Sequence, residues 1–448
     1  MATEWIGTLK EQPVSSGYKW SLAGCVLSMA LALLAVVDFR RGFLFTLIPD
    51  FGGYVAKTPY FVFSPSQVLM LALGIAGLVL SYRSLKRCET ELRGVNLEKY
   101  VRGLTFILFA LLVVDLFTYR GVAATRAAVA GKVGADWLQA FGVGGWLKPM
   151  ALTVSYMLTV WHATFLGVLL AGLAQTVLPR YLKSFFARTG FGGSLFGALF
   201  ALPQPFCSCC ASVIAPSLVR QGASTSFSLA FGVGAPMLNL STLILAAMLL
   251  PTPYAVTRIL AGIVLTVLAT YGVARLAKRW DVIGETVPSN RLVRWIERWV
   301  NAYTRTFHLD KLVRNRRLDT PSTFLSTWLY VSGRIALILV PILLLWSVVT
   351  AAVVQVLPAA FGNNLPSVVI AAVAGTLLMI PTWTEIPVAL QMIQAGFYGP
   401  AATLMVVLPP VSLPCLLILG GCIARFRVAA LLGLVIVVAG IIAGLMFL

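Results

Sequence analysis

Three thiols lie within four residues of one proline-rich stretch. Cys207, Cys209 and Cys210 follow Pro205 in the segment 203–245, whose surroundings are strongly apolar. Thiolates are soft ligands that prefer soft partners such as copper(I), zinc and other thiophilic species. Free cysteine also behaves as a small hydrophobic residue that simply packs. The spacing therefore suggests a site for a thiophilic substrate, with packing alone as the alternative.

A single acid, Glu385, lies in a second proline-rich stretch. It follows Thr384 and stands between Pro381 and Pro387 in the apolar segment 377–419. An acidic side chain at bilayer depth is energetically expensive, so its default interpretation is a proton carrier or a cation ligand. The alternative is a solvated carboxylate at the external membrane interface. We predict that Glu385 and Thr384 belong to the substrate site.

The two stretches align with each other. At an offset of 174 residues, Gly222 and Pro236 fall on Gly396 and Pro410. Irregular backbone at membrane depth is tolerated only where it is buried in protein or lines a cavity. Two interrupted segments at corresponding positions of two halves point to a transporter's substrate site. We therefore predict two inverted repeats, each with a broken re-entrant helical hairpin, around a site at the bilayer midplane.

Further polar side chains lie close to these breaks. Asn239 follows Pro236, and Ser412 and Cys415 lie at the equivalent turn after Pro410. Such groups bind substrate where a helix is unwound, or they hydrogen-bond to neighbouring helices. The predicted substrate site comprises Cys207, Ser208, Cys209, Cys210, Asn239, Thr384, Glu385, Ser412 and Cys415. The predicted hairpin geometry depends on Pro205, Gly222, Pro236, Pro381, Pro387, Gly396 and Pro410.

The composition defines the fold class. Of the 448 residues, 59% are hydrophobic and only 11% are charged, which is typical of an all-α, polytopic integral membrane protein. The net charge of +19 arises from Lys and Arg between apolar spans, as the positive-inside rule requires, so no nucleic-acid partner is implied. We expect a small-molecule or ion substrate, the lipid bilayer as surroundings, and no metal, cofactor or catalytic residue. Proton coupling is an option, and the sequence does not indicate an oligomeric state.

Four regions follow from the charge and hydropathy pattern. They are accessory transmembrane spans in 1–149, a first transport repeat in 150–277, a basic cytoplasmic linker with an amphipathic helix in 278–322, and a second repeat in 323–448. The third accessory span is expected over 103–119, followed by an external, glycine-rich segment over 120–149. Asp115, near the end of that span, is expected to be solvated at the interface. His162 has no second histidine or acid at helical spacing and is expected to pack within the bundle.

The first stretch resembles the signature of the ArsP-type permease family, also called the YraQ family. The resemblance rests on a PxCSC motif, an (R/Q)xG turn and a helix with Ala-Pro and a central Asn, here Pro205, Cys207, Ser208, Cys209, Arg220, Gly222, Ala235, Pro236 and Asn239. Glu385, Pro387, Gly396 and Pro410 occupy corresponding places in the family's later half, whereas Cys210 and the PTWTE sequence differ from its pattern. The resemblance implies an inner-membrane permease, and characterised relatives are associated with efflux of trivalent organoarsenicals such as methylarsenite.

Three functional hypotheses remain. The first is an efflux permease, not an enzyme, whose thiols exchange with a thiophilic substrate while Glu385 takes up or releases a proton. The second is a membrane thiol oxidoreductase, because Cys207 and Cys210 have the CxxC spacing of a redox pair. The third is an assembly subunit whose thiols only pack.

Overall fold

The protein is all-helical throughout the residues that its computed structural model describes. These are 15–36, 65–92, 95–130, 147–181, 188–204, 206–220, 222–282, 298, 318–356, 362–379, 385–422 and 426–448. Within them, seven helices are long and apolar enough to cross a membrane: Ser16–Val36, Pro65–Glu91, Glu98–Phe117, Thr225–Leu249, Thr252–Arg279, Pro321–Ala352 and Arg427–Leu445. The chain is therefore a multi-pass membrane protein, and the predicted fold class is confirmed.

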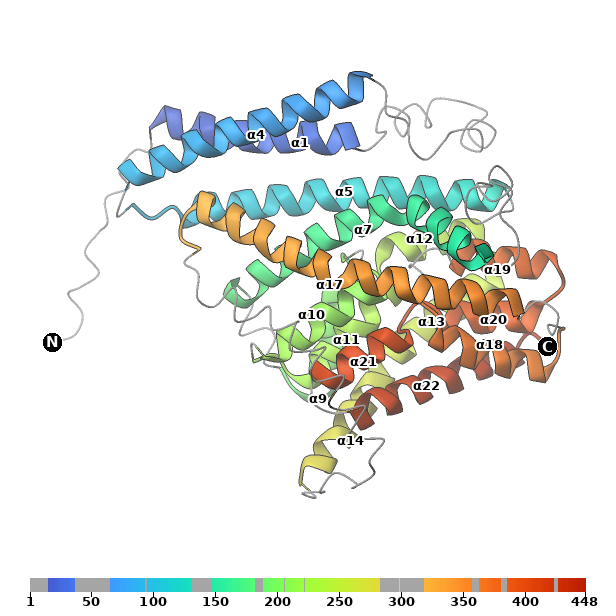
Figure 1. Ribbon diagram of the computed structural model, residues 1–448. Coiled ribbons are helices and arrows are strands. Elements are labelled where there is room, and N and C mark those ends of the chain that lie inside the picture. The colour runs from blue at the N-terminus through green and yellow to red at the C-terminus, as the bar shows by residue number, and fades with distance from the viewer. Residues whose placement is uncertain are drawn as a thin grey trace.

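Three accessory helices come first. Helices α1 (Ser16–Val36) and α4 (Pro65–Glu91) lie side by side along one edge of the molecule, as Figure 1 shows. They approach closely because small residues meet between them, with Gly24 against Ser81 and Gly74 against Ala32. Helix α5 (Glu98–Ala130) lies next to this pair and contacts both α1 and α7 (Lys148–Tyr181). It therefore connects the accessory helices to the rest of the protein.

Helix α5 is longer than the sequence predicts. It continues to Ala130, although the third span was expected to end at 119. The added turns include the sequence GVAATRAAVA, which is rich in alanine, the residue with the highest helix propensity. The first part of the segment 120–149, which was expected to be external and glycine-rich, is therefore helical.

Two sets of helices then follow in the same order. The first set is α7, α9 (Gly190–Ala201), α10 (Ser208–Arg220), α11 (Thr225–Met237), α12 (Leu240–Leu249) and a continuous run of α13 (Thr252–Ile263), the π-helical η2 (Val264–Ala269) and α14 (Thr270–Val282). The second set is α17 (Pro321–Val356), α18 (Leu365–Leu377), α19 (Glu385–Gln394), α20 (Tyr398–Val407), α21 (Leu413–Cys422) and α22 (Phe426–Leu445). Corresponding helices begin 173 to 177 residues apart, as the pairs 190 and 365, 208 and 385, and 225 and 398 illustrate. The repeated order agrees with the sequence offset, whereas the inversion of one set relative to the other stays a prediction.

Each set contains a hairpin whose first half ends at the predicted break. Helix α9 ends at Ala201 and α10 begins at Ser208, whereas α18 ends at Leu377 and α19 begins at Glu385. The predicted residues Pro205, Pro381 and Thr384 lie in these breaks but outside the described residues. Both helix breaks therefore lie at the positions predicted from the prolines in the sequence.

A glycine in the left-handed region ends each hairpin. Gly222 has φ +95° between α10 and α11, and Gly396 has φ +82° between α19 and α20. Only glycine adopts this region without a steric penalty. The two positions are 174 residues apart, so the same turn occurs at the corresponding place in both sets.

The helix after each hairpin is also interrupted. Pro236 lies in the last turn of α11, and α12 resumes after Asn239. In the second set, Pro410 lies in the turn between α20 and α21. Pro387 is tolerated because it stands in the first turn of α19, where its missing N–H has no helical partner to lose.

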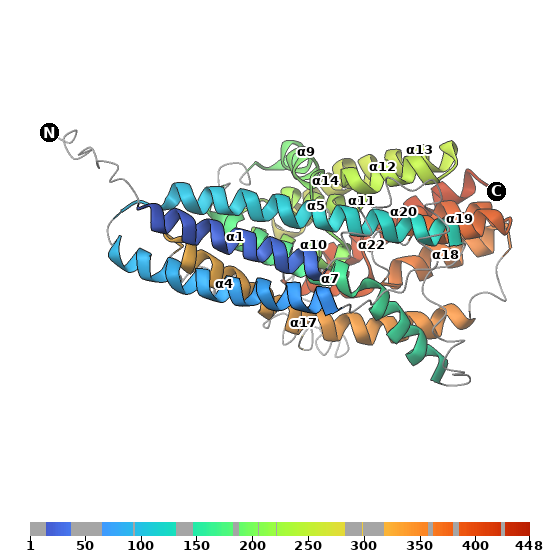
Figure 2. The ribbon, with the colours of Figure 1, turned by 90° about the horizontal axis from the view of Figure 1, so that it is seen from above.

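The buried core lies among the interrupted helices. In the most apolar 18-residue stretch of Thr225–Leu249, 82% of the residues are buried, whereas the share is 11% in that of the accessory span Pro65–Glu91. Figure 2 shows α10 and α11 between α13 on one side of the molecule and α17 on the other. Helices α7 and α17 pack together, and Trp328 donates a hydrogen bond from Nε1 to the Leu169 carbonyl at 2.8 Å.

The basic linker lies mostly outside the described residues. Helix α14 continues into it as far as Val282, and the described chain resumes at 318, apart from residue 298. The predicted amphipathic helix of this region stays a prediction.

A buried carboxylate fixes the start of α17. Glu89 of α4 accepts hydrogen bonds from the Ser322 backbone N–H at 3.0 Å and from the Ser322 hydroxyl. A negative charge at a helix N-terminus satisfies its unpaired N–H groups. We expect Glu89→Ala to lower the free energy of unfolding by about 1–3 kcal/mol in detergent. The exposed neighbour provides the control: Glu91→Ala should change it by less than about 0.5 kcal/mol, and equal effects of the two variants would rule out this contact.

Candidate substrate site

The thiols of the first hairpin form a compact cluster. The Cys207 thiol donates to the Cys210 sulfur at 3.4 Å, one turn further into α10. The Cys209 thiol lies within hydrogen-bonding reach of the Cys207 thiol. All three cysteines are free thiols. Cys209 and Cys210 are buried and Cys207 is half-buried, so Cys207 is the most accessible member.

The second half of the chain contributes a fourth thiol. Cys415 on α21 lies next to Cys209, close enough for the two thiols to interact, because α21 packs against α10. Ser412 donates from its hydroxyl to the Cys415 sulfur at 3.0 Å, and Ser212 of α10 is also within reach of that sulfur. The structure thus brings Cys209 and Cys415 together from the two halves, although 206 positions separate them in the sequence. That these thiols bind substrate stays a prediction.

Helix α7 packs closely against the thiol cluster. A Cβ atom at Gly167 of α7 would lie 3.2 Å from the Cys210 sulfur, so the absence of a side chain there allows α7 to approach. Among the described residues, no group of three or more His, Cys, Asp or Glu side chains is arranged to hold a metal ion. That two thiols bind substrate at a time stays a prediction.

Ser208 and Asn239, two predicted site residues, lie at the starts of helices. Ser208 begins α10 and is buried beside the thiols. Asn239 caps α12: its Oδ1 accepts from the Thr242 N–H at 2.8 Å and the Thr242 hydroxyl at 2.6 Å. Its Nδ2 donates to the Ala235 carbonyl at 2.9 Å. The Asn239 amide therefore bridges the break between α11 and α12.

The predicted acid of the second hairpin is fully buried in an ion pair. Glu385, at the start of α19, is 1% exposed, and its Oε1 accepts a hydrogen bond from Arg258 Nη2 of α13 at 2.9 Å. Arg258 also donates from Nη1 to the Met405 carbonyl at 2.8 Å and to the Met237 sulfur at 3.3 Å. The alternative of a solvated carboxylate at the interface is therefore wrong. The pair joins the first set of helices to the second.

Arg258 is the residue that sequence reasoning missed. It stands inside the apolar span Thr252–Arg279 and is completely buried. A lone cation within a hydrophobic span needs a counter-ion, and so does a lone acid such as Glu385. Because each of these two residues needs a counter-ion, the sequence contained a signal for pairing Arg258 with Glu385.

Each hairpin contacts the other half of the chain. Helix α10 packs against α21, where Cys415 lies. Conversely, Ile386 and Ala389 of α19 belong to the same buried apolar cluster as Leu245 and Ala246 of α12. Both hairpins are therefore buried against the other half of the chain.

A second buried pair corrects the expectation for Asp115, whereas His162, 1% exposed, packs within the bundle as expected. Asp115 of α5 lies 3.6 Å from the Nε2 atom of His162 on α7. Asp115 is only 8% exposed, so it is not solvated at the interface as expected. His162 does have an acidic neighbour, but the acid comes from another helix and helical spacing could not reveal it.

The fold and the site define a class of protein. Multiple apolar spans, doubled helix breaks and buried polar groups where the broken segments meet are features of a membrane transporter.

Comparison with known proteins gives the family. The chain belongs to the ArsP_1 family, described as predicted permeases, whose family model matches residues 146–447. It is 33% identical over 335 residues to UPF0718 protein YraQ of Escherichia coli, covering 73% of this chain and 88% of that protein. It is 27% identical over 131 residues to UPF0718 protein MJ0584 of Methanocaldococcus jannaschii, covering 27% of this chain and 36% of the relative. No solved structure matches the chain.

These findings confirm the resemblance seen in the sequence. The protein is a multi-pass membrane permease, and its family indicates a transporter rather than an enzyme. The matched region begins after α5, so the three accessory helices lie outside it.

Proposed function

We propose that this permease exports a small thiophilic substrate, either a trivalent organoarsenical or a soft metal species, across the inner (plasma) membrane. The observation that supports the proposal most is the approach of Cys209 and Cys415, because each thiol comes from a different half of the chain. A substrate bound to both thiols would bridge the halves. Thiolates prefer soft partners, which is why this substrate class fits the cluster.

The chemistry of binding involves exchange without a change of oxidation state. An organoarsenical such as methylarsenite carries two hydroxyl groups on trivalent arsenic. Each thiol replaces one hydroxyl, forming one sulfur–arsenic bond and releasing one water molecule. Release is the reverse reaction, in which water returns a hydroxyl to arsenic and a proton to sulfur. Ligation by two thiols keeps the reverse reaction accessible, whereas a third sulfur would slow release.

Glu385 would couple this exchange to protons. Protonation of its carboxylate removes the negative charge opposite Arg258, and a buried ion pair that loses one charge is strongly disfavoured. Helices α13 and α19 would then separate, because the 2.9 Å contact between them no longer holds. Deprotonation on the other side of the membrane would restore the pair. The ion pair thus serves as the proton-sensitive contact between the halves.

The orientation of the protein in the membrane follows from the distribution of its basic residues. Arg83, Lys86 and Arg87 lie near the end of α4, in the basic connection to α5, which the positive-inside rule assigns to the cytoplasm. Counting crossings from there gives the two hairpins opposite entry sides, the arrangement expected for inverted repeats and alternating access. The oxidoreductase alternative gains no support from the relatives, which are described as permeases or without an activity.

Transport into everted inner-membrane vesicles tests the proposed function. Vesicles containing the protein should accumulate methylarsenite when a proton gradient is imposed, and a protonophore should abolish the accumulation. Arsenite and copper(I) are measured in parallel, with vesicles lacking the protein as the control. If none of these soft substrates accumulates above the control, the assignment is wrong. Accumulation that survives the protonophore would contradict the coupling through Glu385.

A further inference from the structure

Asp115 and His162 form a buried pair of titratable side chains away from both the thiol cluster and the Arg258–Glu385 contact. The Asp115 Oδ1 atom lies 3.6 Å from the Nε2 atom of His162. Asp115 is 8% exposed and His162 is 1% exposed. Apart from His162, no described residue donates a hydrogen bond to either carboxylate oxygen of Asp115. Within the described chain, the carboxylate therefore depends on His162 for a polar partner.

The net charge of this pair depends on a single proton. When His162 is protonated, an imidazolium faces a carboxylate and the pair is neutral overall. When that proton is absent, the Asp115 charge is buried without a counter-charge. An unpaired charge buried in a membrane-spanning helix is strongly unfavourable. The surroundings therefore favour the protonated state of His162.

The helices packed against α5 bring no other charge to the pair. These are α1, α7, α12, α17 and α19, and α12 has no charged or titratable residue. On α19, Glu385 is already paired with an arginine. On α1, Lys19 lies in the first turn, whereas Leu33, near the other end, lines a cavity together with Asp115. On α5 itself, the charged side chains that the structure describes close to its start lie in the first two turns.

The remaining neighbours of α7 are α10 and α17. The Cys210 thiol of α10 lies beside Gly167, which is five residues, or about 7.5 Å, further along α7 than His162. On α17, Arg334 is exposed. Among the described side chains, protonated His162 is therefore the counter-charge available to Asp115.

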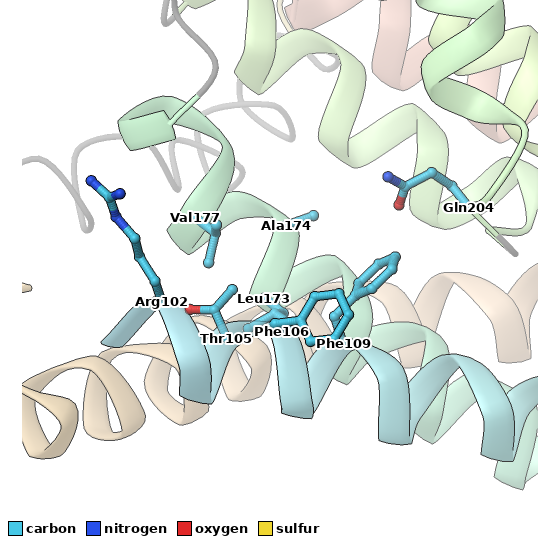
Figure 3. Close-up of a pocket in the computed structure, with 8 residues that line it drawn as sticks. All are labelled: Arg102, Thr105, Phe106, Phe109, Leu173, Ala174, Val177 and Gln204. Carbon is cyan, nitrogen blue, oxygen red and sulfur yellow. The ribbon is translucent and has the colours of Figure 1, made fainter. Parts of the chain in front are cut away.

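The pair lies where the accessory helices are attached to the permease unit. Helix α5 contacts α7, α12 and α19, so it touches both sets of helices. Nearer the start of α5, a cavity of about 460 Å³ lies between this helix and α7, with Phe109 and Leu173 among its lining residues, as Figure 3 shows. Close packing between the two helices is therefore incomplete on that side of the pair. His162 lies within the region that the family model matches and Asp115 lies before it.

We propose that Asp115 and His162 form a second proton-binding site, which holds α5 against α7 while His162 carries its proton. As the pH rises, the proton passes to water and the Asp115 charge loses its partner. Helix α5 then loosens from α7, and the support that it gives to α12 and α19 is reduced. The site includes neither the thiols nor Glu385, so this inference is independent of the proposed substrate.

Nuclear magnetic resonance of protein labelled with nitrogen-15 histidine tests the proton site. The sequence contains only two histidines, so His308→Gln assigns both signals. At about pH 6, His162 should give the signal of imidazolium in the parent and that of neutral imidazole in Asp115→Asn. Glu98→Gln, which changes a partly exposed acid on the same helix, should leave the His162 signal as in the parent. A neutral His162 in the parent at this pH would overturn the proposal.

Thermal unfolding at a series of pH values tests whether the proton holds the two helices together. The parent should be more stable than Asp115→Asn at about pH 6, and this advantage should shrink as the pH rises, by up to about tenfold in the unfolding constant per pH unit for one proton. Glu98→Gln should keep the pH profile of the parent. A difference between parent and Asp115→Asn that does not change with pH would show that the pair only packs. The resonance measurement on the parent needs no variant of the pair, so its result stands even if Asp115→Asn does not accumulate.

Discussion

Arg258→Gln is expected to lower the free energy of unfolding by about 3–5 kcal/mol, because it leaves the Glu385 carboxylate buried without its counter-charge. Transport should be lost in the same variant, since the contact between the halves disappears. Glu385→Gln should destabilise by a similar amount, because Arg258 then carries the uncompensated charge. Thermal unfolding of purified protein and vesicle transport measure the two effects.

The double variant separates stability from function. Arg258→Met combined with Glu385→Leu removes both charges and keeps similar volumes, so stability should return to within about 1–2 kcal/mol of the parent. Transport should not return, because no proton-binding group remains. Arg275→Gln is the matched control: Arg275 is exposed on α14, and its loss should have little effect on either measurement. Proton-driven transport by the double variant would refute the coupling role of the pair.

Cys209→Ser and Cys415→Ser are each expected to lower methylarsenite transport at least about tenfold, which corresponds to about 1.4 kcal/mol of lost binding. The physical reason is that a hydroxyl does not replace a thiol as a soft ligand. Both residues are buried in the contact between α10 and α21, so each variant removes one of the two proposed bonds to substrate.

Cys25→Ser provides the comparison for this prediction. Cys25 is also a buried free thiol, but it lies on the accessory helix α1. Its substitution should leave methylarsenite transport close to that of the parent. Equal transport by Cys25→Ser, Cys209→Ser and Cys415→Ser, at equal amounts in the membrane, would show that the cluster only packs.

The helix breaks could be predicted from the sequence because their cause is local. Proline is disfavoured in a helix interior, and the breaks before Ser208 and Glu385 occur beside prolines, although α10 and α17 continue through Pro216 and Pro341. The glycine turns at Gly222 and Gly396 were predictable for the same reason, since a left-handed backbone requires glycine. Local chemistry thus determines the hairpins.

The ion pairs between separate helices could not be predicted in this way. Arg258 and Glu385 are 127 positions apart, and their contact depends on how α13 lies against α19. The same holds for Asp115 with His162, whose acid and base come from α5 and α7. The π-helical turn at Val264–Ala269 has no distinctive sequence pattern either. Tertiary packing, which the local sequence does not encode, decides all three.

The central claim is that thiols from both halves bind one substrate together. X-ray absorption at the arsenic edge of methylarsenite-loaded, purified protein tests it most directly. We predict two sulfur neighbours of arsenic in the parent and one in Cys209→Ser or Cys415→Ser. Bound arsenic with only carbon and oxygen neighbours, or with the same sulfur number in the double Cys209→Ser and Cys415→Ser variant as in the parent, would contradict the account.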